Sequence, residues 1–83
     1  MDPTLTRRLR SVARAIRERR LALGVDATQA NVARRARLSV RHLQKVEAGE
    51  VVPRLDTLLL LARALETDAQ SLLDHAERLL RGT

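Results

Sequence analysis

The sequence predicts an all-α protein, a compact bundle of about five helices in a single domain over residues 1–83. Its length is near the lower limit for a self-sufficient core. Hydrophobic residues make up 45% of the chain, yet Phe, Tyr and Trp are absent, so Leu, Val, Ile and Ala must fill that core. Apolar and polar residues never alternate for more than about four positions, which argues against strands.

The first predicted helix opens at Asp2 and Pro3, an N-cap residue followed by proline at the first helical position. Its closing signal is Gly24. Between these ends, apolar residues recur at three- and four-residue spacing, as one face of a helix requires. They are Leu5, Leu9, Val12, Ile16 and Leu23.

A second, shorter helix should start after Thr28, whose hydroxyl group suits an N-cap, and run to about Ala36. We expect it to bury Val32 and Ala33. Only a short connection separates it from the next predicted helix.

The third predicted helix runs from Ser39, again an N-cap, to about Ala48. Leu38 precedes the cap and Leu43 occupies the fourth helical position, so the two are placed to form a hydrophobic staple. Only Leu43 and Val46 are turned toward the core. The remainder of this helix is mostly polar, which leaves side chains free for another purpose.

Two further helices are predicted in the last third of the chain. One covers about 54–66, after the loop that ends at Pro53, and the other covers about 68–81. Each carries an apolar stripe. The first is expected to bury Leu55, Leu58, Leu61, Ala62 and Leu65, and the second carries Ala69, Leu72, Leu73, Ala76, Leu79 and Leu80 on its stripe.

Basic charge is concentrated in the first two-thirds of the chain. Lys and Arg number 16 against 10 Asp and Glu, a net charge of +6. Residues 1–24 contribute +5 and residues 25–50 contribute +2, whereas residues 51–83 contribute −1. This asymmetry suggests one side that faces a polyanion and another that serves packing. An ordinary solvated, arginine-rich surface explains the charge equally well.

The two short helices, joined by little more than Arg37 and Leu38, have the architecture of a helix-turn-helix over about 28–48. The stretch resembles the motif of the Cro/CI-type (XRE, lambda-repressor-like) family, which typically has Gln first, Ala fifth, and aliphatic residues at the fifteenth and eighteenth positions. Here these are Gln29, Ala33, Leu43 and Val46. The resemblance extends over about residues 12–73, and it implies a lambda-repressor-like DNA-binding domain.

The face of the third helix that points away from the core carries the candidate base-reading residues. They are Val40, Arg41, Gln44 and Lys45. The resemblance implies that these positions touch base edges. Arg can bind guanine, Gln can pair with adenine, Val can cover a thymine methyl group, and Lys can reach guanine or a phosphate. The alternative is an ordinary solvated helix face.

Contacts to the DNA backbone are expected at the start of the second helix, where free N–H groups and the helix dipole favour a phosphate. The resemblance points to Gln29 there. The set of candidates is Thr28, Gln29, Ser39, His42 and Arg54.

The resemblance also implies an ion pair between Arg20, late in the first helix, and Glu47, at the end of the third. We expect this pair to orient the third helix and to be partly exposed, so that it is worth about 1 kcal/mol or less. The neighbouring Arg17 and Arg19 are expected on the solvent side of the first helix.

Two features depart from the family pattern. The ninth motif position is usually Gly, because the turn there often needs a left-handed backbone, and here it is Arg37. A non-glycine residue in that conformation costs about 1 kcal/mol, so the turn is expected to be either slightly strained or slightly different in shape. Residues 25–28 also look longer than usual, which leaves the helix-turn-helix intact.

A homodimer is expected, because one helix-turn-helix reads few base pairs and specific binding usually requires two half-sites about one DNA turn apart. The resemblance places the dimer contact on the last helix, about 68–81. Leu60 is a further candidate, since relatives commonly carry a charge there, although an exposed Leu is also ordinary. The expected interface residues are Leu60, Leu72, Ala76, Leu79 and Leu80.

Other classes of function find little support. The chain has no Cys or Tyr, no glycine-rich phosphate loop and only two His, so no enzyme, cofactor or metal site is predicted. It lacks the aromatic residues on which single-stranded RNA usually stacks. The longest apolar run, at 58–62, is far too short to span a bilayer. The N-terminus does not resemble a signal peptide.

The predicted function is that of a sequence-specific regulator of transcription that binds double-stranded DNA. We expect a small repressor or autoregulator in the cytoplasm of bacteria, of bacterial or phage origin, bound at the nucleoid to a pseudo-palindromic operator. The rival interpretation is an antitoxin or another module whose main task is to bind a partner protein. The sequence does not choose among a phage-type repressor, an antitoxin and a restriction–modification controller.

Overall fold

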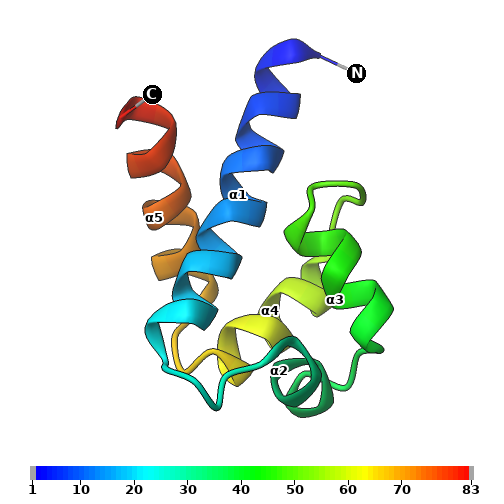
Figure 1. Cartoon of the computed structure of the whole chain (residues 1–83). Helices are drawn as coiled ribbons and strands as arrows, with labels where there is room; N and C mark the ends of the chain where they lie inside the picture. Colours follow the sequence, from blue (N-terminus) through cyan, green and yellow to red (C-terminus); the bar gives the residue numbers. More distant parts are fainter. Residues whose placement is uncertain (1, 83) are drawn as a thin grey trace.

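The computed structural model describes residues 2–82, and these residues form five helices and no strand. The helices are α1 (Pro3–Ala22), α2 (Gln29–Arg35), α3 (Val40–Glu47), α4 (Leu55–Ala64) and α5 (Ala69–Gly82). The predicted all-α fold with about five helices is therefore confirmed. Figure 1 shows α5 lying along α1, while α2, α3 and α4 gather around the C-terminal part of α1.

Short polar side chains begin the helices at the positions that the sequence indicated. The Thr28 hydroxyl accepts a hydrogen bond from the N–H of Asn31 at 3.1 Å, and the Ser39 hydroxyl accepts one from His42 at 3.0 Å. Each bond satisfies one N–H group that the helix leaves unpaired, which stabilises the helix by about 1 kcal/mol. The two helices of the motif are thus defined by local chemistry.

Three helices end in the same kind of turn, with one residue in the left-handed conformation. That residue is Arg37 after α2 (φ 60°), Gly49 after α3 (φ 73°) and Glu66 after α4 (φ 58°). After α2, the N–H of Leu38 donates to the carbonyl of Ala33 at 2.8 Å, a bond that closes a Schellman turn. Of the two alternatives for the turn at Arg37, the structure has the left-handed one, and the left-handed backbone of Glu66 was not anticipated.

The core lies where the C-terminal part of α1 meets the other helices. Its largest fully buried side chains are Ile16, Val32, Leu43, Val46, Leu61, Leu65 and Leu72. The prediction that Leu55 is buried is wrong, because its side chain is 70% exposed. Leu55 is the first residue of α4, and the buried part of that helix begins later, at Thr57 and Leu58. No helix in the described part of the chain is long and apolar enough to cross a membrane.

Candidate nucleic-acid interface

Helix α3 has one buried face and one open face. The inner residues Leu43 and Val46 are at most 1% exposed. The four predicted base-contacting residues are Val40, Arg41 and Gln44, which are exposed, and Lys45, which is half-buried. The polar side chains among them make no hydrogen bond or ion pair with another described residue. The open face of α3 is therefore available to an external ligand.

A hollow of about 310 Å³ lies beside this open face. Its lining consists of Ser39, Arg41, His42, Lys45 and Val51. Two predicted base-contacting residues and two predicted backbone-contacting residues thus meet at one place. Val51, which the sequence did not single out, comes from the loop between α3 and α4. Nothing in the sequence distinguishes Val51 from the adjacent Val52.

The expected ion pair between Arg20 and Glu47 is present, and it is more deeply buried than predicted. Arg20 Nε donates to Glu47 Oε2 at 2.8 Å, and Nη2 donates to Oε1 at 3.0 Å. The two side chains are only 12% and 4% exposed. The pair is thus less exposed than expected, and removing one of its partners should cost about 3 kcal/mol, because it would leave an uncompensated charge in a mostly buried place.

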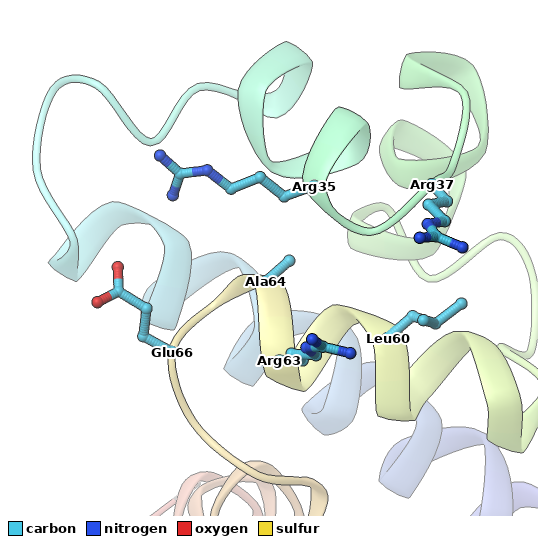
Figure 2. Close-up of a pocket in the computed structure, with 6 residues that line it drawn as sticks. All are labelled: Arg35, Arg37, Leu60, Arg63, Ala64 and Glu66. Atoms are coloured by element: carbon cyan, nitrogen blue, oxygen red, sulfur yellow. The ribbon is translucent and has the colours of Figure 1, made fainter.

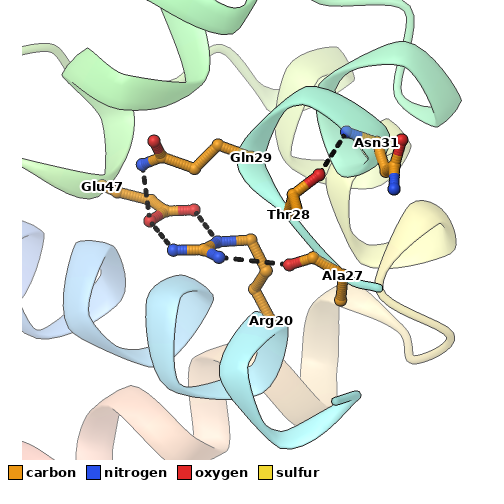
Figure 3. A network of polar contacts seen from close by, with 6 residues as sticks. All are labelled: Arg20, Ala27, Thr28, Gln29, Asn31 and Glu47. Atoms are coloured by element: carbon orange, nitrogen blue, oxygen red, sulfur yellow. Dashed lines mark hydrogen bonds and ion pairs between the residues drawn. The ribbon is translucent and has the colours of Figure 1, made fainter. Parts of the chain in front are cut away.

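Gln29 completes this network. Its Nε2 donates to Glu47 Oε1 at 3.1 Å, and Arg20 Nη1 donates to the carbonyl of Ala27 at 3.1 Å. Figure 3 shows how these contacts join the end of α1, the start of α2 and the end of α3. The side chain of Gln29, which was predicted to contact a phosphate, is thus engaged within the protein and helps to fix α3 in place.

Arg19 differs from its expected position on the solvent side of α1. Its Nε donates to the carbonyl of Leu65 at 2.9 Å, and its Nη2 donates to the carbonyl of Glu66 at 3.0 Å. The last carbonyl groups of a helix have no partner within it and form the negative end of its dipole, so a guanidinium group stabilises them. Arg17 is exposed, as expected. Neighbouring arginines of α1 therefore hold different helices, Arg19 holding α4 and Arg20 holding α3.

Arg54, a predicted backbone contact, occupies the N-cap position of α4. Its side chain is 83% exposed and forms an ion pair with Asp56 at 3.3 Å. An exposed pair of this kind contributes little to stability. Arg54 can therefore exchange the carboxylate of Asp56 for a phosphate group.

Asn31 is a residue whose role the sequence analysis missed. Its Nδ2 donates to the carbonyl of Asp26 at 2.7 Å, while its N–H group donates to the Thr28 cap. The segment 25–28, which includes a turn at Val25 and Asp26, is thereby attached to the start of α2. Asn commonly forms such bonds to nearby backbone groups, and its place three residues after a predicted N-cap was the available signal.

The residues predicted for a dimer interface fall into two groups. Leu72 and Ala76 are 2% and 4% exposed within a single chain, so they have little area left to offer a second copy. Leu60 is 37% exposed, and Leu79 and Leu80 are half-buried. The exposed leucine of α5 is instead Leu73, at 42%. The centre of the apolar stripe packs inside the protomer, and its edge remains accessible.

Comparisons with known proteins identify the motif independently. A family model described as a helix-turn-helix matches residues 16–72, which include α2, α3 and the residues of the buried ion pair. None of the curated proteins and none of the solved structures matches the chain. The chain belongs to the helix-turn-helix family of the Cro/CI (XRE) type, a family of DNA-binding domains.

Proposed function

We propose that this protein binds double-stranded DNA at specific sequences and regulates transcription, with α3 in the major groove. The observation that carries this proposal is the contrast between the two faces of α3. Its inner face and its last residue, Glu47, are locked in the protein, whereas Arg41 and Gln44 are exposed and unpaired. A fixed helix with free donors and acceptors is what base-edge recognition requires.

The distribution of charge supports the same proposal. Residues 1–50, which include α1, α2 and α3, carry twelve basic and five acidic residues, a net charge of +7. Residues 51–83 carry a net charge of −1. A basic surface around the reading helix increases affinity for any duplex and makes that affinity depend on salt.

The protein is proposed to act as a homodimer whose contact lies at the open end of α1 and α5. An apolar cleft of about 280 Å³ runs between these helices there. Its apolar lining consists of Leu5, Leu9, Val12, Leu73, Ala76 and Leu80. Leu5 and Leu73 are 47% and 42% exposed, and a two-fold contact would remove both from water.

Selection of preferred duplexes from a random pool, followed by fluorescence anisotropy at several salt concentrations, tests the assignment of residues. Arg41→Ala should relax the base preference and weaken binding to the preferred site by about 1–3 kcal/mol. Arg54→Ala should weaken preferred and random duplexes similarly and flatten the salt dependence, because it removes a phosphate contact.

If Arg41→Ala weakens preferred and random duplexes equally, α3 does not read bases through this face. If the selection enriches no sequence at all, the rival role as a protein-binding module such as an antitoxin gains support. Footprinting of the preferred duplex tests the dimer, which should protect two half-sites about one helical turn apart.

A further inference from the structure

A groove between α2 and α4, away from the open face of α3, carries three arginines. It has a volume of about 380 Å³ and lies between the C-terminal ends of the two helices. Its lining consists of Arg35, Arg37, Leu60, Arg63, Ala64 and Glu66. Figure 2 shows Leu60 and Ala64 directed from α4 toward α2, with the charged side chains arranged around them. The α2–α4 groove therefore has an apolar floor and a charged rim.

The positive charges of this rim have no partner in the described part of the chain. Arg35, Arg37 and Arg63 make no side-chain hydrogen bond or ion pair there, and Glu66 is the one acidic residue of the lining, so the groove carries a formal charge of +2. Guanidinium groups bind carboxylates through paired, charge-assisted hydrogen bonds. The groove thus presents unused capacity for an anionic group.

The backbone supplies a second, independent observation. Arg37 and Glu66 are the two non-glycine residues with left-handed backbone among those described, and both line this groove. Glycine adopts this conformation freely after a helix. Arg35 and Arg63 lie in the last turns of α2 and α4, where the negative end of the helix dipole favours a positive charge. Arg37 lies beyond the end of α2, where this explanation for a positive charge does not apply. Residues kept in unfavourable backbone conformations tend to cluster at binding sites.

The groove lies at the opposite ends of α2 and α4 from the proposed DNA contacts Thr28 and Arg54, although Arg37 precedes the proposed contact Ser39 by only two residues. Thr28 and Arg54 begin α2 and α4, whereas Arg37 and Arg63 lie about 13 Å further along them. No residue proposed to touch bases or phosphates lines the groove. An occupant of the groove therefore need not displace any side chain proposed to contact DNA.

We propose that the α2–α4 groove binds an acidic segment of a partner protein, with carboxylates on Arg37 and Arg63 and an apolar side chain over Leu60. A second copy of this chain fits poorly, because a two-fold contact through the groove would set one positive rim against another. Duplex DNA would offer phosphates to the rim but no apolar side chain for the half-exposed Leu60. This proposal extends beyond DNA binding and does not depend on it.

The test uses a fluorescein-labelled short peptide of alternating Glu and Leu residues, with the same peptide carrying Gln in place of Glu as the uncharged control. The protein should bind the acidic peptide and not the Gln peptide. Arg37→Gln with Arg63→Gln should weaken acidic-peptide binding by about tenfold or more. The matched control is Arg34→Gln with Arg78→Gln, which removes the same charge from exposed residues outside the groove and should change binding by no more than about twofold.

Arg37→Gly separates binding from stability. Because glycine tolerates the left-handed turn, this variant should keep or raise the Tm while it weakens binding of the acidic peptide. A variant that binds the peptide as well as the unmodified protein would remove Arg37 from the site and overturn the proposal.

Several other outcomes also overturn it. One is the absence of peptide binding, and another is an equal loss in the Arg34 and Arg78 control, which would indicate general electrostatic attraction. A third is a lower salt slope for duplex DNA in the Arg37→Gln, Arg63→Gln variant, which would assign the groove to phosphates. Altered self-association of that variant in sedimentation would assign the groove to a second copy.

Discussion

The two ends of α1 lie in regions that are built differently. Residues 16–72 form a helix-turn-helix core, in which the main buried cluster begins at Ile16 and ends at Leu72. Residues 3–15 of α1 and 73–82 of α5 form an arm of two helices. In this arm, Leu5 and Leu73 remain about half exposed. The bounds of the core coincide with the segment that matches the helix-turn-helix family. Exposed apolar side chains occur in both regions, but in the arm Leu5 and Leu73 line a common cleft between α1 and α5.

The same contrast appears in the ion pairs that join α1 to another helix. In the core, Arg20 and Glu47 are 12% and 4% exposed. In the arm, Arg8 pairs with Glu77, and these side chains are 48% and 43% exposed. Identical chemistry therefore operates in two different environments, and burial decides how much each pair matters for stability.

The largest expected effect is the loss of the buried pair. Glu47→Gln should lower the free energy of unfolding by about 3 kcal/mol, because it leaves the Arg20 charge buried without a counter-ion. Glu77→Gln should lower it by only about 0.5 kcal/mol, because water solvates Arg8 in its place. Urea unfolding followed by circular dichroism measures both. Equal losses in the two variants would contradict the division into core and arm.

An intermediate effect is expected on self-association. Leu73→Glu should weaken the dimer by about tenfold or more, since it places a charge where an apolar side chain would be buried, and it should leave protomer stability nearly unchanged. Sedimentation equilibrium measures the dissociation constant. Leu55→Glu, at an exposed leucine outside the arm, serves as the control. If Leu60→Glu dissociates the dimer and Leu73→Glu does not, the contact lies on α4.

The smallest effect is expected from pH, at Asp68, which lies just before α5. Hydrogen bonds from the backbone N–H and the side chain of Ser71 lower the pKa of Asp68, which caps this helix. A carboxyl group with a lowered folded-state pKa stabilises the fold above its unfolded-state pKa, and that contribution is lost as the pH falls through the folded-state value. The start of α5 should therefore loosen below about pH 4.

Asp68→Asn keeps a side-chain oxygen that can cap the helix but cannot titrate. Amide chemical shifts of residues 69–72 should change between neutral and acid pH in the unmodified protein more than in this variant. Indistinguishable acid profiles would show that the Asp68 cap does not respond to pH.

Local signals in the sequence were sufficient to predict much of the core. The caps Thr28 and Ser39 and the spacing of Leu43 and Val46 depend only on neighbouring residues, and all four have the predicted place. For the turn at Arg37, the family resemblance left a strained and a different geometry open, and the structure has the left-handed, strained one.

Features that join distant segments were predicted less well. The burial of the Arg20–Glu47 pair depends on three helices that converge on it, and no local pattern reports such convergence. Arg19 was misplaced because its acceptors, Leu65 and Glu66, belong to a turn 46 and 47 residues away. On α5, periodicity identified the apolar stripe but could not tell which leucines α1 would cover. The predicted base, phosphate and dimer contacts stay predictions.

Helix α1 is a single rod of 20 residues, about 30 Å long, and its two ends do different work. The last turn of α1 binds the end of α3 through Arg20 and the end of α4 through Arg19. The first turns of α1 lie in the arm that is proposed to contact a second copy. In the proposed dimer, the continuous α1 of each protomer would fix the distance between the two α3 helices. The dimer would therefore bind only half-sites with the matching spacing. One residue inserted into the middle of α1 would turn the first half of this helix by about 100° relative to its second half. Because α5 lies along α1 and continues unbroken from the core into the arm, the inserted residue would take the apolar stripe of the first turns out of register with α5, so the arm and the dimer contact proposed for it would be lost while the core keeps its own contacts.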